Sequence, residues 1–149
     1  MSKPAWLGWP LALAAALGPV VWLILYWWVR PDINVQETSA NPSGIILVCL
    51  LYPLVEELAF RGYLQTKISE FPWAKVARYH ITVANCCTSV LFVTVHFFYH
   101  PPIWSISIIA PSLIFGGFKD RYDSVVPGLI LHCLYNSGYY LLFGFSYAG

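Results

Sequence analysis

Charged residues are scarce in this chain. Only 10% of its 149 residues are Asp, Glu, Lys or Arg, and 58% are hydrophobic, whereas an ordinary soluble domain is about 25% charged. The formal net charge is +1, so the chain has no basic stripe that would neutralise the phosphates of a nucleic acid. This composition excludes nucleic-acid binding and predicts a membrane protein.

Motifs of metal sites and disulfide frameworks are also absent. The cysteines show no C-x-x-C spacing and lie in apolar stretches, which indicates small hydrophobic fillers (Cys49, Cys86, Cys87 and Cys133). The lack of an H-E-x-x-H helix excludes a familiar zincin arrangement. The N-terminal apolar run ends without a small-x-small cleavage site, so we expect it to remain as a membrane span.

Five hydrophobic windows approach the roughly 20 residues that a helix needs to cross a bilayer. They cover residues 6–29, 44–66, 81–99, 103–118 and 125–146. The fourth is the shortest and contains Pro111, so we expect it to be tilted, broken or only partly inserted. Because no internal repeat or long linker interrupts the chain, residues 1–149 are predicted to form one all-α domain, a polytopic transmembrane helical bundle.

Basic residues predict the orientation of this bundle. One set of alternate loops holds Lys3, Lys67, Lys75, Arg78, Lys119 and Arg121, and the other holds only Arg30. Because cytoplasmic loops carry the excess of Lys and Arg, five crossings place the N-terminus in the cytoplasm and the C-terminus outside. The segment FPWAKVARYH, residues 71–80, resembles an interfacial helix at the headgroups. His80 and His100, at span ends, are interpreted as interfacial residues.

Polar residues inside the predicted spans are the functional candidates, since a buried carboxylate is costly and usually faces the bundle interior. Glu57 and Arg61, four residues apart on one helix face, are interpreted as a neutralising pair. Glu56 turns about 100° away from that pair and needs another partner. Pro53 predicts a kink, which either is an ordinary transmembrane kink or opens the wall beside Glu56.

Candidate partners of Glu56 lie in the third and fifth spans. FVTVH places Phe92 and His96 one helical turn apart, and HCLYN does the same for His132 and Asn136. A carboxylate with two imidazoles can hydrolyse an amide through water, with Glu56 as general base and His96 holding the water or orienting Glu56. His132 and Asn136 would then bind the oxyanion. A zinc ion held by Glu56, His96 and His132 is the alternative.

The depths of these residues set a geometric condition. At about 1.5 Å per residue, Glu56 lies ~15 Å and His132 ~10 Å from the cytoplasmic face, but His96 lies ~24 Å deep if its helix begins at residue 80. The three side chains would then not meet. We therefore expect the third helix to begin nearer Ala84, with residues 70–80 lying along the interface.

The three motifs together resemble those of a known family. EELAFR, FVTVH and HCLYN, in this order and in separate spans, are similar to the EExxxR, FxxxH and HxxxN motifs of the CPBP family of intramembrane proteases, which comprises CAAX proteases and bacteriocin-processing enzymes. The resemblance covers about Ile45 to Tyr140. It implies a glutamic-type endopeptidase that needs no metal cofactor, with zinc as the alternative. The catalytic residues implied are Glu56, His96, His132 and Asn136, with Glu57, Arg61 and Phe92 in support.

The chain is short, with about five predicted spans where the eukaryotic enzymes of this family have more, so its substrate is inferred from the smaller members. The similar small prokaryotic members are associated with bacteriocin leaders or C-terminal sorting tails. The resemblance therefore implies a multi-pass protein of a prokaryotic inner membrane that cleaves a membrane-protein or lipidated-peptide substrate, and a sorting tail is favoured. The catalytic cavity is expected to open towards the cytoplasmic half. A non-catalytic bacteriocin-immunity or binding membrane protein of the same fold is the alternative function. A proton-coupled carrier is disfavoured because paired repeats are lacking.

Overall fold

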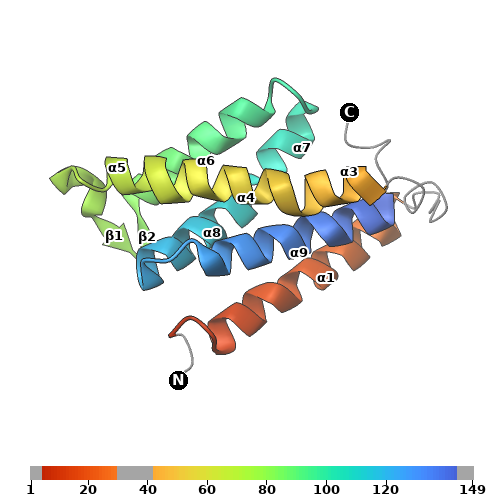
Figure 1. Ribbon diagram of the computed structural model, residues 1–149, viewed down its shortest axis with the longest axis horizontal. Helices are drawn as coiled ribbons and strands as arrows, with labels where there is room; N and C mark the ends of the chain where they lie inside the picture. The colour runs from red at the N-terminus through yellow and green to blue at the C-terminus, as the bar shows by residue number, and fades with distance from the viewer. Residues whose placement is uncertain (1–4, 30–41, 144–149) are drawn as a thin grey trace. The chain divides into compact units, whose positions relative to one another are not determined.

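The computed structural model describes residues 5–29 and 42–143, which are nearly all helical (Figure 1). The chain divides into two compact units: residues Met1–Pro53 with Ile130–Gly149, and residues Leu54–Leu129. The helices and strands are, in chain order, α1 (Trp9–Val29), α3 (Pro42–Ile46), the π-helical segment η1 (Leu47–Leu51), α4 (Tyr52–Glu56), the π-helical segment η2 (Glu57–Gln65), α5 (Thr66–Ile68), the 3₁₀ turn η3 (Pro72–Lys75), β1 (Ala77–Arg78), β2 (Ile81–Thr82), α6 (Val83–His96), α7 (Pro102–Ser107), α8 (Ile109–Tyr122) and α9 (Val126–Phe143). The prediction of an all-α membrane bundle is confirmed.

Three helical runs in the described part of the chain are long and apolar enough to cross a membrane. They are Trp9–Trp28, Pro42–Ile68 and Pro102–Tyr122, which correspond to the first, second and fourth predicted spans. Helix α6 has only 14 residues, about 21 Å at 1.5 Å per residue, against a hydrocarbon core of about 30 Å. Helix α9 is less apolar because it carries His132, Asn136 and Ser137. Residues 144–146 of the fifth predicted span lie outside the described residues.

The fourth predicted span is interrupted at Ile108, between α7 and α8. Pro111 lies three residues further along and lacks the N–H that would bond to the carbonyl of Ser107. Its ring also crowds that turn of the helix. The span therefore contains an irregular turn at Ile108 within a helical run that is long enough to cross a membrane.

The predicted interfacial helix at residues 71–80 is wrong. After the η3 turn, β1 and β2 pair antiparallel, with Ala77 opposite Thr82 and Arg78 opposite Ile81. The two residues between the strands, Tyr79 and His80, have φ of 52° and 64°. Positive φ at both central residues is what a two-residue type I′ turn requires. Pro72 and the β-branched residues near the hairpin favour this extended route over a helix.

Helix α6 begins at Val83, which confirms the prediction of a start near Ala84. Thr82 caps the helix, because its Oγ1 accepts a hydrogen bond from the backbone N of Asn85 at 3.0 Å. The backbone N and Oγ1 of Thr82 donate to Asp120 Oδ2 at 3.1 and 2.9 Å. Gln65 Nε2 donates to the other oxygen, Oδ1, at 2.7 Å. One carboxylate on α8 thus fixes the end of η2 and the start of α6.

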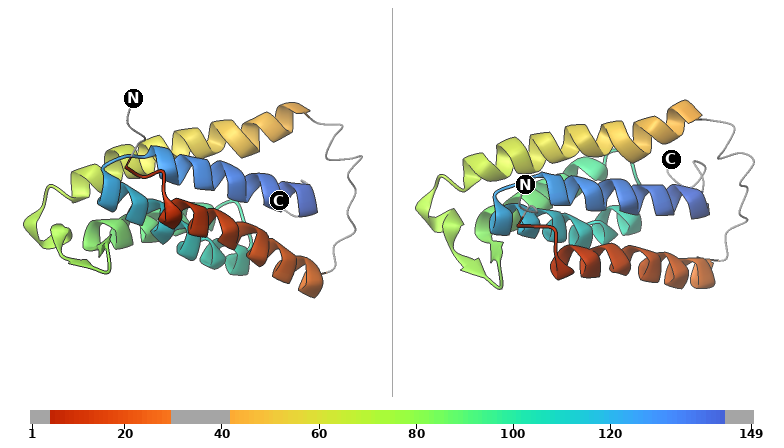
Figure 2. Two further views of the ribbon diagram at one scale, coloured as in Figure 1. Left: turned by 90° about the horizontal axis from the view of Figure 1, so that it is seen from below. Right: turned by 60° about the horizontal axis from the view of Figure 1, so that its bottom comes forward.

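Helices α6 and α8 run side by side in the second unit (Figures 1 and 2). Asn85 Nδ2 donates to the carbonyl of Leu113 at 3.0 Å, and Ser89 Oγ donates to Asn85 Oδ1 at 3.1 Å. Gly116 faces this asparagine so closely that a Cβ there would lie 2.0 Å from Asn85 Oδ1. A residue without a side chain is therefore needed for the two backbones to approach, as is common between membrane helices.

In the first unit, α1 packs against α9 by the same means. A Cβ on Gly138 would lie 2.2 Å from Cζ2 of Trp22. The Tyr135 hydroxyl donates to the carbonyl of Ala14 at 2.6 Å. The Trp22 and Tyr135 rings meet edge to face with centroids 6.5 Å apart. These contacts hold the helix that carries the HxxxN motif.

The contact at Gly116 predicts a position-specific loss of stability. Gly116→Ala should lower the free energy of unfolding by roughly 1–3 kcal/mol, because the new methyl group overpacks the Asn85 contact. The matched control is Gly117→Ala, whose Cβ would meet nothing nearer than the His80 carbonyl at 3.8 Å. Thermal unfolding of both variants in one detergent measures the difference. Equal stability of the two variants would contradict this packing.

Candidate active site

Glu56 and His96 come together in the second unit, at the ends of α4 and α6. His96 Nε2 lies 4.0 Å from Glu56 Oε1, and the two side chains are 14% and 29% exposed. This separation is too long for a direct hydrogen bond and is within reach of one bridging water. The structure thus joins two of the four predicted catalytic residues within one unit.

The orientation of His96 is fixed by its own helix. Its Nδ1 lies 2.8 Å from the carbonyl oxygen of Phe92. Because a carbonyl only accepts, Nδ1 carries the hydrogen, and in the neutral ring Nε2 is the acceptor on the side of Glu56. A water between the two groups would donate one hydrogen to each. Its lone pairs would then point away from both, which is the orientation that a nucleophile needs.

The Phe92 ring holds the imidazole from the other side. It packs against His96 with ring centroids 4.4 Å apart, and against Phe60 edge to face at 5.0 Å. The guanidinium carbon of Arg61 lies 4.6 Å from the centroid of the same ring, a cation–π distance. The phenylalanine of the FxxxH motif therefore contacts the histidine of its own motif and the arginine of EExxxR.

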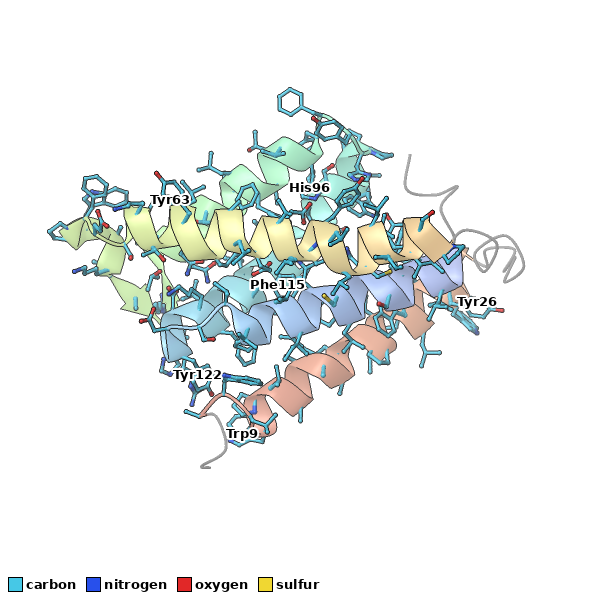
Figure 3. All side chains as sticks on the ribbon, viewed as in Figure 1. Trp9, Tyr26, Tyr63, His96, Phe115 and Tyr122 are labelled. Atoms are coloured by element: carbon cyan, nitrogen blue, oxygen red, sulfur yellow. The ribbon has the colours of Figure 1, made fainter. Side chains whose placement is uncertain are left out.

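Arg61 and Glu57 form the neutralising pair that the sequence predicts. Arg61 Nη1 lies 3.3 Å from Glu57 Oε1, and both side chains are fully buried. Arg61 Nη2 also donates to the carbonyl oxygen and the Oγ of Ser112, at 3.1 and 2.7 Å. The guanidinium carbon lies 5.8 Å from the ring centroid of Phe115, a residue of α8 that is labelled with His96 in Figure 3. These contacts join η2 to α8 beside the Glu56–His96 pair.

Wide helical turns lie on both sides of the stretch from Tyr52 to Glu56, and Glu57 begins the second of them, a feature that the sequence did not reveal. Glu56 is the last residue before η2, and Pro53 follows the shorter π-helical segment η1. Such turns are rare and often lie at functional sites. The signal in the sequence was Pro53, which was interpreted as a kink. The structure accommodates it with a wider turn.

His132 and Asn136 lie one helical turn apart on α9, in the first unit. The His132 side chain is buried, with 6% of its surface exposed. Asn136 Nδ2 donates to the carbonyl oxygen of Val48 in η1 at 2.8 Å. Within the first unit, this bond joins the HxxxN helix to the helix that leads into the EExxxR motif.

His100 and Trp104 also belong to the aromatic cluster around His96, although His100 was interpreted as interfacial. The His96 and His100 rings stack with centroids 5.7 Å apart, and the His100 and Trp104 rings lie 4.0 Å apart. The signal was the spacing HFFYH, which puts two histidines four residues apart. The spacing did not predict the ring contact because α6 ends at His96 and the chain turns back there.

The zinc alternative requires Glu56, His96 and His132 as ligands. Among residues 5–29 and 42–143, no group of three or more His, Cys, Asp or Glu side chains is arranged to hold a metal ion. Within the second unit, Glu56 and His96 supply two donors. A water held by these two groups fits the observed 4.0 Å separation.

Comparison with known proteins identifies the family. Residues 38–138 match the family described as Rce1-like, type II CAAX prenyl endopeptidase Rce1-like. The match covers more than half of the chain and includes all three motifs, so the chain belongs to this family of membrane-embedded endopeptidases. This confirms the family that the motifs indicated. Searches of curated proteins and of solved structures gave no match.

The buried ion pair predicts a large cost for breaking it. Glu57→Gln leaves the Arg61 guanidinium buried without its counter-ion and should lower the free energy of unfolding by about 3–5 kcal/mol. The matched control is Glu70→Gln, which breaks the exposed 2.8 Å pair with Lys67 and should leave stability unchanged. Unfolding of both variants is followed in detergent. If Glu57→Gln is as stable as wild type, the Glu57–Arg61 ion pair does not stabilise the fold.

Proposed function

We propose that this protein is a glutamic-type intramembrane endopeptidase that hydrolyses a peptide bond of a membrane-associated substrate. The observation that carries the proposal is the Glu56–His96 pair, 4.0 Å apart, with the tautomer of His96 set by the Phe92 carbonyl. With an ionised Glu56 and a neutral His96, the carboxylate and Nε2 both accept hydrogen bonds. A single water between them is then oriented for attack on a carbonyl carbon. Membership of an endopeptidase family supports the same reaction class.

The proposed reaction needs one base and one oxyanion site. Glu56 takes a proton from the water as the oxygen attacks the scissile carbonyl, and returns it to the leaving amine when the C–N bond breaks. The tetrahedral intermediate carries an oxyanion, for which a fixed donor is typically worth about 10²–10³ in rate. His132 and Asn136 are assigned to this role by the HxxxN motif.

The proposed location and orientation rest on charge. Within the second unit, Lys75 and Lys119 line one cleft with Asp120, Asp123 and Gln65, the residue that ends η2. Because basic residues mark the cytoplasmic side, we place this end in the cytoplasm of a prokaryotic cell and the protein in its inner membrane. The proposed substrate is a membrane protein with a C-terminal sorting tail, or a lipidated peptide.

The general-base assignment predicts that Glu56→Gln loses peptidase activity. The amide cannot take a proton from water, so kcat should fall by about 10²–10⁴, the usual contribution of a general base. The substrates offered are a farnesylated CAAX peptide and a library of peptides with hydrophobic C-terminal tails, with the protein purified in detergent. The control is Glu70→Gln, a carboxylate removed from an exposed surface position.

Equal cleavage by wild type and Glu56→Gln would end the general-base assignment. If neither substrate class is cleaved by wild type, while the protein binds a bacteriocin or protects cells against one, the alternative of a non-catalytic immunity protein is correct. The two outcomes are separable because the first needs measurable turnover.

The metal-free mechanism predicts insensitivity to chelators. Prolonged dialysis against a strong chelator should leave kcat unchanged, and purified active protein should contain far less than one zinc per chain. Metal content and turnover are measured on the same sample. Stoichiometric zinc whose removal abolishes turnover, and whose return restores it, would overturn this mechanism in favour of a zinc-bound water.

A further inference from the structure

Pro53 leaves a backbone carbonyl without its usual donor. In the π-helical segment η1, the N–H of Tyr52 donates to the carbonyl of Leu47, five residues earlier. The next donor in this pattern would be residue 53, which would bond to the carbonyl of Val48. Residue 53 is a buried proline and has no N–H. A partly buried carbonyl that loses its donor is stabilised by a replacement partner.

Asn136 supplies that partner. Its Nδ2 donates to the Val48 carbonyl oxygen at 2.8 Å, which is an ordinary hydrogen-bond length. An asparagine amide has two hydrogens on Nδ2, and this bond uses one of them. The direction of the second hydrogen is then fixed by the plane of the amide. The anchor for the asparagine therefore exists because proline stands at position 53.

We infer that Pro53 is a positioning residue that acts through Asn136. By lacking an N–H, it makes the Val48 carbonyl available, and that carbonyl orients the Asn136 amide so that its second hydrogen serves as the oxyanion donor. This inference deepens the proposed function and rests on it for the catalytic role of Asn136. The hydrogen-bond substitution itself, from Pro53 through Val48 to Asn136, does not depend on that role.

A double-mutant cycle on stability tests the substitution without any assay of activity. Pro53→Ala gives residue 53 an N–H, which can bond to Val48 in place of Asn136. Asn136→Ala leaves the Val48 carbonyl without a donor and should lower the thermal midpoint. Adding Pro53→Ala to Asn136→Ala should then raise the midpoint by several degrees more than Pro53→Ala does in wild type. Pro53→Val supplies the same N–H and is the second variant.

A kinetic cycle tests the positioning role with the peptide substrates above. Pro53→Ala should lower kcat by about tenfold, less than the ~10² lost with a whole donor, and leave KM unchanged. In the Asn136→Ala background, Pro53→Ala should have no further effect on kcat. A proline needed only for the shape of the helix would cost the same factor in both backgrounds. Pro19→Ala, which removes another proline inside a helix of the first unit, is the control and should keep wild-type kcat.

Equal stability effects of Pro53→Ala in both backgrounds would overturn the hydrogen-bond substitution. If the stability effects of Pro53→Ala and Asn136→Ala are coupled but Pro53→Ala keeps the wild-type kcat, only the positioning role is overturned. Failure of the proposed function is distinguishable from both, because it shows as unchanged cleavage in Glu56→Gln while the stability cycle keeps its result.

Discussion

The buried guanidinium of Arg61 is the constraint on which the second unit depends. A guanidinium charge taken out of water is costly unless a counter-ion and hydrogen-bond acceptors lie close to it. Arg61 receives these from two directions, since Glu57 lies 3.3 Å away on its own helix and Ser112 accepts two bonds from α8. Any sliding of η2 against α8 would break this set. The register between the two helices is therefore fixed by electrostatics as much as by packing.

The EExxxR and FxxxH motifs describe one connected structure. Arg61 lies over the Phe92 ring, and that ring packs against His96. The Phe92 carbonyl sets the tautomer of the same imidazole, which faces Glu56 at 4.0 Å. The carbonyl contact needs only the backbone of residue 92, whereas the packing around the imidazole needs the Phe92 ring and the Arg61 guanidinium beside it. This connection explains why the phenylalanine and the arginine accompany the glutamate and histidine.

The features that could be predicted from the sequence are those that depend on the regular periodicity of a helix. The helical bundle, the Glu57–Arg61 pair and the start of α6 all follow from residue spacing and rise per residue. The β-hairpin could not be predicted in this way, because its turn is formed by Tyr79 and His80, neither of which is a usual residue of a type I′ turn. The contact of His100 with His96 depends on where the chain turns after α6, which no local pattern encodes. The wide turn before Pro53 depends on how that proline is accommodated.

Two adjacent glutamates therefore have different environments for a physical reason. Glu57 is fully buried and committed to the Arg61 guanidinium, while the Glu56 side chain keeps 29% of its surface exposed. A base must exchange protons with water and substrate, which a carboxylate held against a buried cation does poorly. Because consecutive residues of a helix point about 100° apart, Glu56 and Glu57 face different surroundings. The buried pair fixes the helix, and the fixed helix holds Glu56 within one water of His96, so Glu57 is a condition for the position of the proposed base.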